Sequence, residues 1–83
     1  MEKKAEVGIA YVFVKTEVGQ EKKVLNEVKK ASCVGEAFVL LGGYYDILVK
    51  VSYSTQKELK DTVVYQIRTN PHVISTLTLI SVN

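Results

Sequence analysis

Hydrophobic residues are grouped in four runs along the chain, separated by two segments in which apolar and charged residues mix. The first run, residues 7–15, is rich in β-branched and aromatic residues, which is typical of a strand. Three later runs of the same kind predict strands at 36–41, 46–53 and 73–82. The sequence therefore predicts four strands.

The two mixed segments, at about 20–31 and 55–69, predict helices because their apolar residues recur every three or four positions. Ser54 or Thr55 is expected to cap the second helix, and Glu58 follows Thr55 at the spacing of a capping box. A proline at position 71 ends this segment. The apolar residues at helical spacing are Val24, Leu25, Val28 and Ala31 in the first segment and Leu59, Val63 and Ile67 in the second.

The resulting order is βαββαβ, with the two halves joined by a hairpin. This order predicts an α+β, ferredoxin-like fold with a four-stranded antiparallel sheet. Right-handed crossovers place both helices on one face of such a sheet. Residues 1–83 are expected to form a single domain.

The opposite face of the predicted sheet has no covering element in the sequence. Exposed strands usually carry polar residues at every second position. Here both alternating sets are largely apolar in the first two strands: Val7, Ile9, Tyr11 and Phe13 against Gly8, Ala10, Val12 and Val14, and Ala37, Val39 and Leu41 against Phe38 and Leu40. We therefore expect the sheet to dimerise through this face, as facing sheets about 10 Å apart. A monomer with a moderately apolar face is the alternative.

Composition narrows the functional classes. A formal net charge of +2 is too small to predict nucleic-acid binding from charge alone. No apolar run reaches the length that crosses a membrane, and the N-terminus lacks a secretory signal, so a cytoplasmic protein without a membrane partner is expected. Cys33 and His72 each stand alone, and we expect no metal, no cofactor and no catalytic residues.

The hairpin between the second and third strands carries the main binding hypothesis. Backbone N–H groups at Gly42 and Gly43 are unshielded and suit a carboxylate, whereas Asp46 could accept hydrogen bonds from an ammonium group. Together these groups suit a zwitterion. The alternative is a plain Gly-Gly hairpin in which Asp46 satisfies amides of the turn.

Residues 43–46, Gly-Tyr-Tyr-Asp, resemble the G-x-Y-D element of the ligand-responsive domain in the leucine-responsive/AsnC family of transcription regulators. That domain is known as the RAM (regulation of amino acid metabolism) domain. Residues 70–80 resemble its last strand, in which hydroxyl residues precede an aliphatic end. The resemblance extends over nearly the whole chain in the order and lengths of the elements.

The resemblance implies a domain that binds a free amino acid as effector and modulates transcription or amino-acid metabolism through a partner. It implies dimers through facing sheets that assemble further, into an octameric or decameric ring, and possible co-assembly with a full-length family regulator. Ligands in this family bind in clefts between dimers. Carried over by position, the binding residues are Gly42, Gly43, Tyr44, Asp46, Thr76 and Thr78.

The sequence departs from the family in two places. The regulators usually carry an N-terminal helix-turn-helix, whereas only residues 1–6 precede the first predicted strand, so direct DNA binding is not expected. His72 stands where the family usually has glycine, so it is open whether the turn into the last strand has the same geometry as in the family.

Two other functions stay open. One is a purely structural oligomerisation module, and the other is a small oxygenase or isomerase of the dimeric α/β-barrel type. Tyr11, Phe13 and Tyr53 could also form a platform for stacked RNA bases, although interface packing explains them with fewer assumptions.

Overall fold

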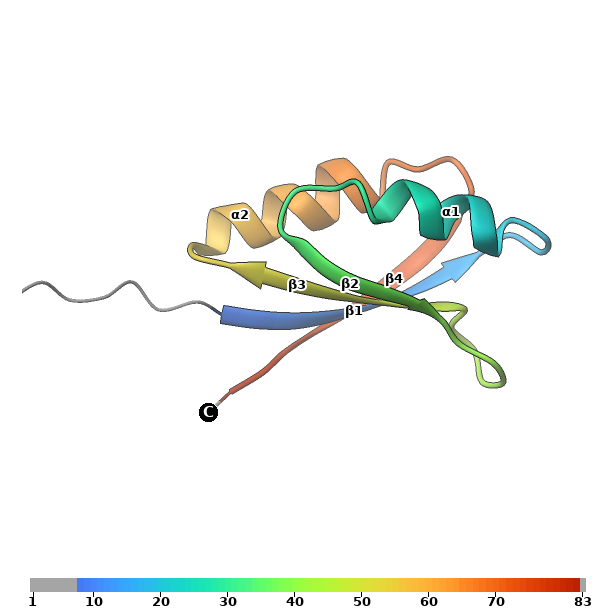
Figure 1. The fold of residues 1–83 in the computed structure, drawn as a ribbon, viewed down its shortest axis with the longest axis horizontal. Helices are drawn as coiled ribbons and strands as arrows, with labels where there is room; N and C mark the ends of the chain where they lie inside the picture. The colour runs from blue at the N-terminus through green and yellow to red at the C-terminus, as the bar shows by residue number, and fades with distance from the viewer. Residues whose placement is uncertain (1–7, 83) are drawn as a thin grey trace, which may run out of the picture.

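A computed structural model describes residues 8–82, so Val7 of the first predicted strand and the segment 1–6 lie outside the described residues. The chain forms four strands and two helical segments in the predicted order (Figure 1). Their bounds are β1 (Gly8–Thr16), α1 (Glu21–Val28), β2 (Val34–Val39), β3 (Ile47–Tyr53), α2 (Gln56–Asp61), the π-helical turn η1 (Thr62–Ile67) and β4 (Val73–Ile80).

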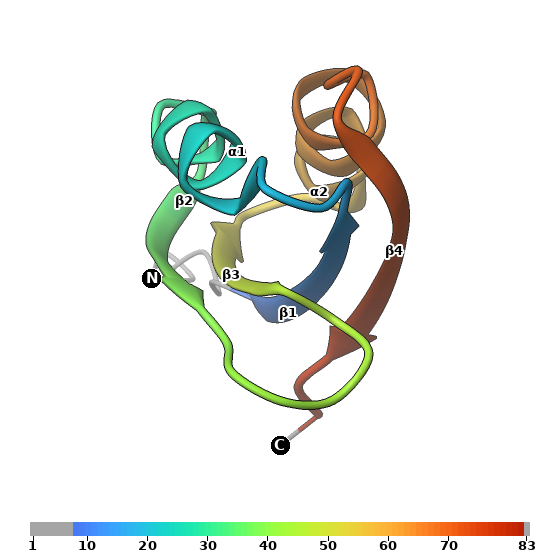
Figure 2. The ribbon, with the colours of Figure 1, turned by 90° about the vertical axis from the view of Figure 1, so that its right-hand side faces the viewer.

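The strands form one antiparallel sheet in the order β2-β3-β1-β4, which leaves β2 and β4 at its two edges. Both helical segments lie on the same face of this sheet, and the loop between β2 and β3 extends to the other side (Figures 1 and 2). This arrangement confirms the predicted ferredoxin-like fold.

The core lies between the helices and the covered face of the sheet. Alternation along β1 sends Ala10, Val12 and Val14 into it, all fully buried. Ile67 from η1 is fully buried against the same cluster. The remaining apolar members are Val24, Val28, Ala37, Ile47, Val49, Val51, Tyr53, Leu59 and Val63.

The other face of the sheet, called here the free face, carries a row of four large apolar residues. Strand register aligns Phe38 with Leu48, Leu48 with Phe13, and Phe13 with Leu77, so the row crosses all four strands. Phe38 is 51% exposed and Leu77 is 42% exposed. The neighbouring row adds Tyr11 and Leu79, which pair with each other. The predicted apolar face is therefore present and uncovered in the described residues of one chain.

Tyr53 belongs to the opposite face. It is 8% exposed and packs in the core, because its position in β3 shares the parity of Val49 and Val51. A stacking platform that combines it with Tyr11 and Phe13 is therefore wrong.

The segment predicted as a helix at 55–69 is divided into α2 and η1. Thr55 is the N-cap: its side chain accepts a hydrogen bond from the Glu58 amide, and Glu58 accepts one from the Ser54 amide, as in a capping box. After Asp61 the turn widens, and the Arg68 amide donates to the Val63 carbonyl five residues earlier at 2.8 Å. Periodicity alone does not reveal this change.

Two other boundaries differ from the predictions. Helix α1 ends at Val28, so Ala31 lies in the following turn instead of on the helical stripe. Strand β2 begins at Val34, which places Gly35 within the strand, and it ends at Val39. Leu40 and Leu41 are therefore the start of a loop and not the end of a strand.

Gly8 lies against the ring of Tyr53, which gives a direct test of the packing at the start of β1. A Cβ atom at this position would lie 2.5 Å from Cζ of Tyr53. We expect Gly8→Ala to push the ring out of the core and to lower the free energy of unfolding by roughly 1–3 kcal/mol. Chemical denaturation measures the change.

Gly35→Ala is the matched control, because it is also a strand glycine but its added Cβ would lie 3.8 Å from the nearest atom, the Lys50 carbonyl oxygen. Equal losses in the two variants would contradict the placement of Tyr53 over Gly8.

Candidate hairpin and edge-strand site

The loop between β2 and β3, residues 40–46, is called here the hairpin loop. The Leu40 amide donates to the Asp46 carbonyl at 2.8 Å and closes it. Gly42 and Gly43 have φ angles of +82° and +78°, a region that glycine adopts without steric cost. The connection is a seven-residue loop, longer than the four residues that separate the predicted strands 36–41 and 46–53.

Asp46 anchors the base of the hairpin loop to the end of β1. Its Oδ2 accepts a hydrogen bond from the Thr16 amide at 2.9 Å and one from the Thr16 hydroxyl at 3.3 Å. The same oxygen lies 3.6 Å from Nζ of Lys15. The carboxylate therefore has a structural role within the chain, and it contacts β1 instead of amides of its own turn.

Tyr44 stands on the surface of the hairpin loop and is 60% exposed. The Lys15 ammonium lies 5.0 Å from the centre of its ring, within the range of a cation–π contact. Tyr45 packs edge-on against Tyr44 with ring centres 4.9 Å apart, and its other neighbour is Phe13 of the free face at 5.8 Å. These contacts connect the hairpin loop to the free face.

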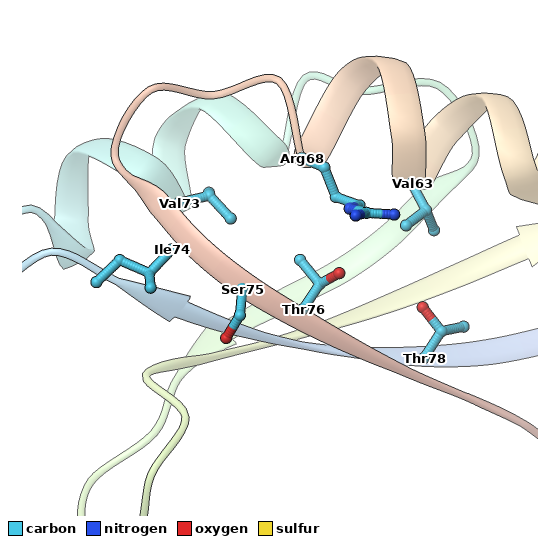
Figure 3. A pocket seen from close by; sticks show the side chains of 7 residues that line it. All are labelled: Val63, Arg68, Val73, Ile74, Ser75, Thr76 and Thr78. Atoms are coloured by element: carbon cyan, nitrogen blue, oxygen red, sulfur yellow. The ribbon is translucent and has the colours of Figure 1, made fainter.

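Thr76 and Thr78 lie on β4, on the face that carries the helices, because they pair with the core positions Val14 and Val12. They line a hollow of about 420 Å³, called here the β4 hollow, together with Val63 of η1 and Arg68, the residue that follows η1 (Figure 3). Side chains of Thr76, Thr78 and Arg68 point into this hollow from two elements (Figure 3).

A second hollow, of about 410 Å³, lies between the hairpin loop and the start of α1. Gly42 and Asp46 line it, together with Glu21 and Lys22. It shares no lining residue with the β4 hollow. Within one chain, Gly42 and Asp46 therefore line a different hollow from Thr76 and Thr78.

Four residues near these groups were not predicted: Lys15, Thr16, Lys22 and Arg68. Alternation along β1 could have placed Lys15 on the free face and Thr16 on the covered face, next to the hairpin loop. No sequence signal indicates Arg68, because its direction depends on the π-helical turn.

Cys33 and His72 both make contacts within the chain that give them a structural role. Cys33 packs partly buried against the core and has a φ of +69°, a left-handed conformation that is uncommon outside glycine. His72 Nδ1 lies 2.8 Å from the Glu17 carboxylate, and its amide donates to the Asn70 side chain. Its φ is not positive, so the turn into β4 does not require the glycine found in the family.

Within residues 8–82, no group of three or more His, Cys, Asp or Glu residues is placed to hold a metal ion. Over the same residues, neither helical segment has the length and apolar character needed to cross a membrane.

Comparisons with known proteins find relatives by structure and not by sequence. No protein-family model matches the chain, and no curated protein matches it. The crystal structure of FFRP-DM1 superposes with a TM-score of 0.83 and 32% sequence identity, over 90% of this chain and 99% of that one.

Two transcription regulators share the fold at lower identity. AsnC of E. coli matches with a TM-score of 0.83 and 24% identity over 95% of this chain, and this chain spans 52% of AsnC. The transcriptional regulator NMB0573 of Neisseria meningitidis, solved as a complex with L-Met, matches with a TM-score of 0.78 and 15% identity over 92% of this chain and 50% of its own.

Proposed function

Because the chain belongs to the leucine-responsive/AsnC regulator family, we propose that it is a regulatory domain that binds a free amino acid in a self-associated state. The observation that carries the proposal is the hairpin loop, where two glycines with exposed amides and a carboxylate lie within five residues of one another. A nest of amides suits the ligand carboxylate, and Asp46 suits its ammonium group.

The free face supports self-association. A contiguous row of apolar side chains crosses all four strands, and an exposed apolar patch of this kind often marks a contact between proteins. A second copy placed face to face would cover Phe13, Phe38, Leu48 and Leu77. We propose that these dimers then associate into a larger oligomer.

The separation of the two residue groups supports an assembly larger than a dimer. Gly42, Gly43, Tyr44 and Asp46 belong to the hairpin loop, whereas Thr76 and Thr78 lie on the edge strand β4 and line a different hollow. If the hairpin loop of one copy meets β4 of another, the two groups form one site. Such a contact joins two different surfaces, and repeated contacts of this kind form a ring when the rotation between copies closes, which is the arrangement that we propose.

The relatives agree with a regulatory role. The similar regulator NMB0573 was solved with L-Met, and amino-acid binding by this chain is proposed by analogy with it. We further propose a cytoplasmic protein that modulates a partner, such as a full-length regulator of the same family, without catalysis of its own.

A purely structural oligomerisation module is the second candidate. It is favoured by the contacts of Asp46, whose Oδ2 already accepts two hydrogen bonds from Thr16 within the chain. The two candidates share the free face and differ only at the hairpin loop.

Asp46→Asn separates the two candidates. The asparagine oxygen can still accept the hydrogen bond from the Thr16 amide, but it no longer carries the charge that would pair with a ligand ammonium. We expect the variant to fold and assemble, and its affinity for the amino acid that binds the wild type to fall at least about tenfold. Isothermal titration calorimetry measures the affinity, and size-exclusion chromatography with light scattering measures the assembly.

The matched control is Asp61→Asn, which removes the same charge from an exposed ion pair with Lys57 on α2. Its affinity should equal that of the wild type. If Asp46→Asn also binds as the wild type does, Asp46 has only its structural role.

A further inference from the structure

The β4 hollow contains a cation that the proposed contacts of an amino-acid ligand do not use. Arg68 is the only arginine of the chain, and its guanidinium points into the hollow beside Thr76 and Thr78 (Figure 3). Among residues 8–82, no carboxylate forms an ion pair with it and no hydrogen bond holds it. The fixed donors of the guanidinium therefore face the hollow without a partner in the described part of the chain.

The π-helical turn explains why Arg68 points there. In an α-helix each residue advances roughly 100° about the axis, so residues five apart point about 140° away from each other. The 2.8 Å bond from the Arg68 amide to the Val63 carbonyl closes a wider turn, and both residues line the same hollow. Such local widening is frequent at functional sites.

The chemistry of the lining is suited to an anion. A guanidinium presents several N–H donors in a planar fork that matches the two oxygens of a carboxylate. Thr76 and Thr78 add two hydroxyl donors, and neither hydroxyl has a hydrogen-bond partner among the described residues. No acidic side chain lines the hollow to compete for the arginine.

We propose that Arg68, Thr76 and Thr78 form a subsite for the anionic side-chain group of the ligand, so that the domain prefers an acidic amino acid over an aliphatic one. This inference rests on the proposed function. In it, the amides of Gly42 and Gly43 bind the α-carboxylate and Asp46 binds the ammonium group. Arg68 is then available for a second carboxylate.

The test is calorimetric titration of the full chain with L-glutamate, L-aspartate, L-leucine and L-methionine, and with succinate and inorganic phosphate as anions without an ammonium group. We expect an acidic amino acid to bind at least about tenfold more tightly than the aliphatic ones. In Arg68→Gln this preference should disappear, through a roughly 10- to 100-fold loss for the acidic ligand alone. Arg68→Lys keeps the charge without the planar fork and should retain part of the preference.

Lys60→Gln on α2 is the control, because it removes one exposed positive charge without altering the hollow. It should bind every ligand as the wild type does. If Arg68→Gln weakens all amino acids equally, Arg68 binds the α-carboxylate, and the proposed preference is wrong. Tighter binding of leucine or methionine, unchanged in Arg68→Gln, overturns the subsite and leaves the amino-acid function intact.

The anions distinguish the remaining cases. Binding of succinate or phosphate that is lost in Arg68→Gln, without a response to any amino acid, supports the anion subsite and contradicts the proposed amino-acid function. If none of these compounds binds, both the anion subsite and the amino-acid function are contradicted.

Discussion

Leu77→Asp should convert an assembled protein into monomers. Leu77 is the β4 member of the apolar row on the free face, next to Phe13, and is 42% exposed in the single chain. In a face-to-face dimer its side chain would lie between two sheets, away from water. A carboxylate there would be buried without a partner, which costs several kcal/mol per chain.

The mass in solution, measured by sedimentation equilibrium over a range of concentrations, tests this prediction. Val18→Asp is the control, because Val18 is 94% exposed in the turn before α1 and lies outside the free face. It should retain the wild-type mass. A wild-type protein that is monomeric at all concentrations, or a Leu77→Asp variant with unchanged mass, would contradict the assigned interface.

Ile67→Ala should cause the largest loss of stability within one chain. Ile67 is fully buried where η1 packs on the sheet, and removal of its side chain leaves a cavity beneath the π-helical turn. Substitutions of this kind cost about 2–5 kcal/mol. Because natural domains of this size have roughly 4–12 kcal/mol in total, this loss removes a large share of the stability.

Urea denaturation at one fixed protein concentration measures the loss, since assembly adds to the apparent stability. Ile67→Val should cost only about 0.5–1.5 kcal/mol. Tyr65→Ala, at a position of the same turn that is 64% exposed, should be close to neutral. A small loss in Ile67→Ala would mean that η1 is not packed on the sheet as described.

The fold could be predicted because each element has a strong local signal. The strands follow alternating burial, as in β1, where Ala10, Val12 and Val14 are buried and Tyr11 is exposed. The second helix begins where the capping box places it, at Gln56 with Thr55 as its N-cap. The same alternation along the strands also predicted apolar residues on the free face.

Other features depend on contacts between distant segments. Asp46 bonds to Thr16, thirty residues earlier, and this pairing follows from the strand register and not from the local motif. Tyr53 packs over Gly8 because β3 and β1 are neighbours. The direction of Arg68 depends on a widened turn that has the same apolar spacing as an ordinary helix.

The candidate site was predicted only as a set of residues. Its six members lie on the hairpin loop and on β4, and the sequence pattern does not indicate how copies of the chain meet. Their union in one pocket therefore stays a prediction about the assembly. The same limit explains why the ligand's side chain could not be predicted from the hairpin loop alone.

Thermal unfolding of the unmodified protein with each common amino acid at millimolar concentration tests the central proposal most directly. A ligand at a hundred times its dissociation constant stabilises the folded state by about 2.7 kcal/mol, which raises the unfolding temperature of a domain of this size by roughly 10–20 °C. We predict such a shift for one or a few amino acids, acidic ones foremost, and no shift for the rest. If no amino acid raises the unfolding temperature, the sensor function is contradicted and an oligomerisation module is the account that is left.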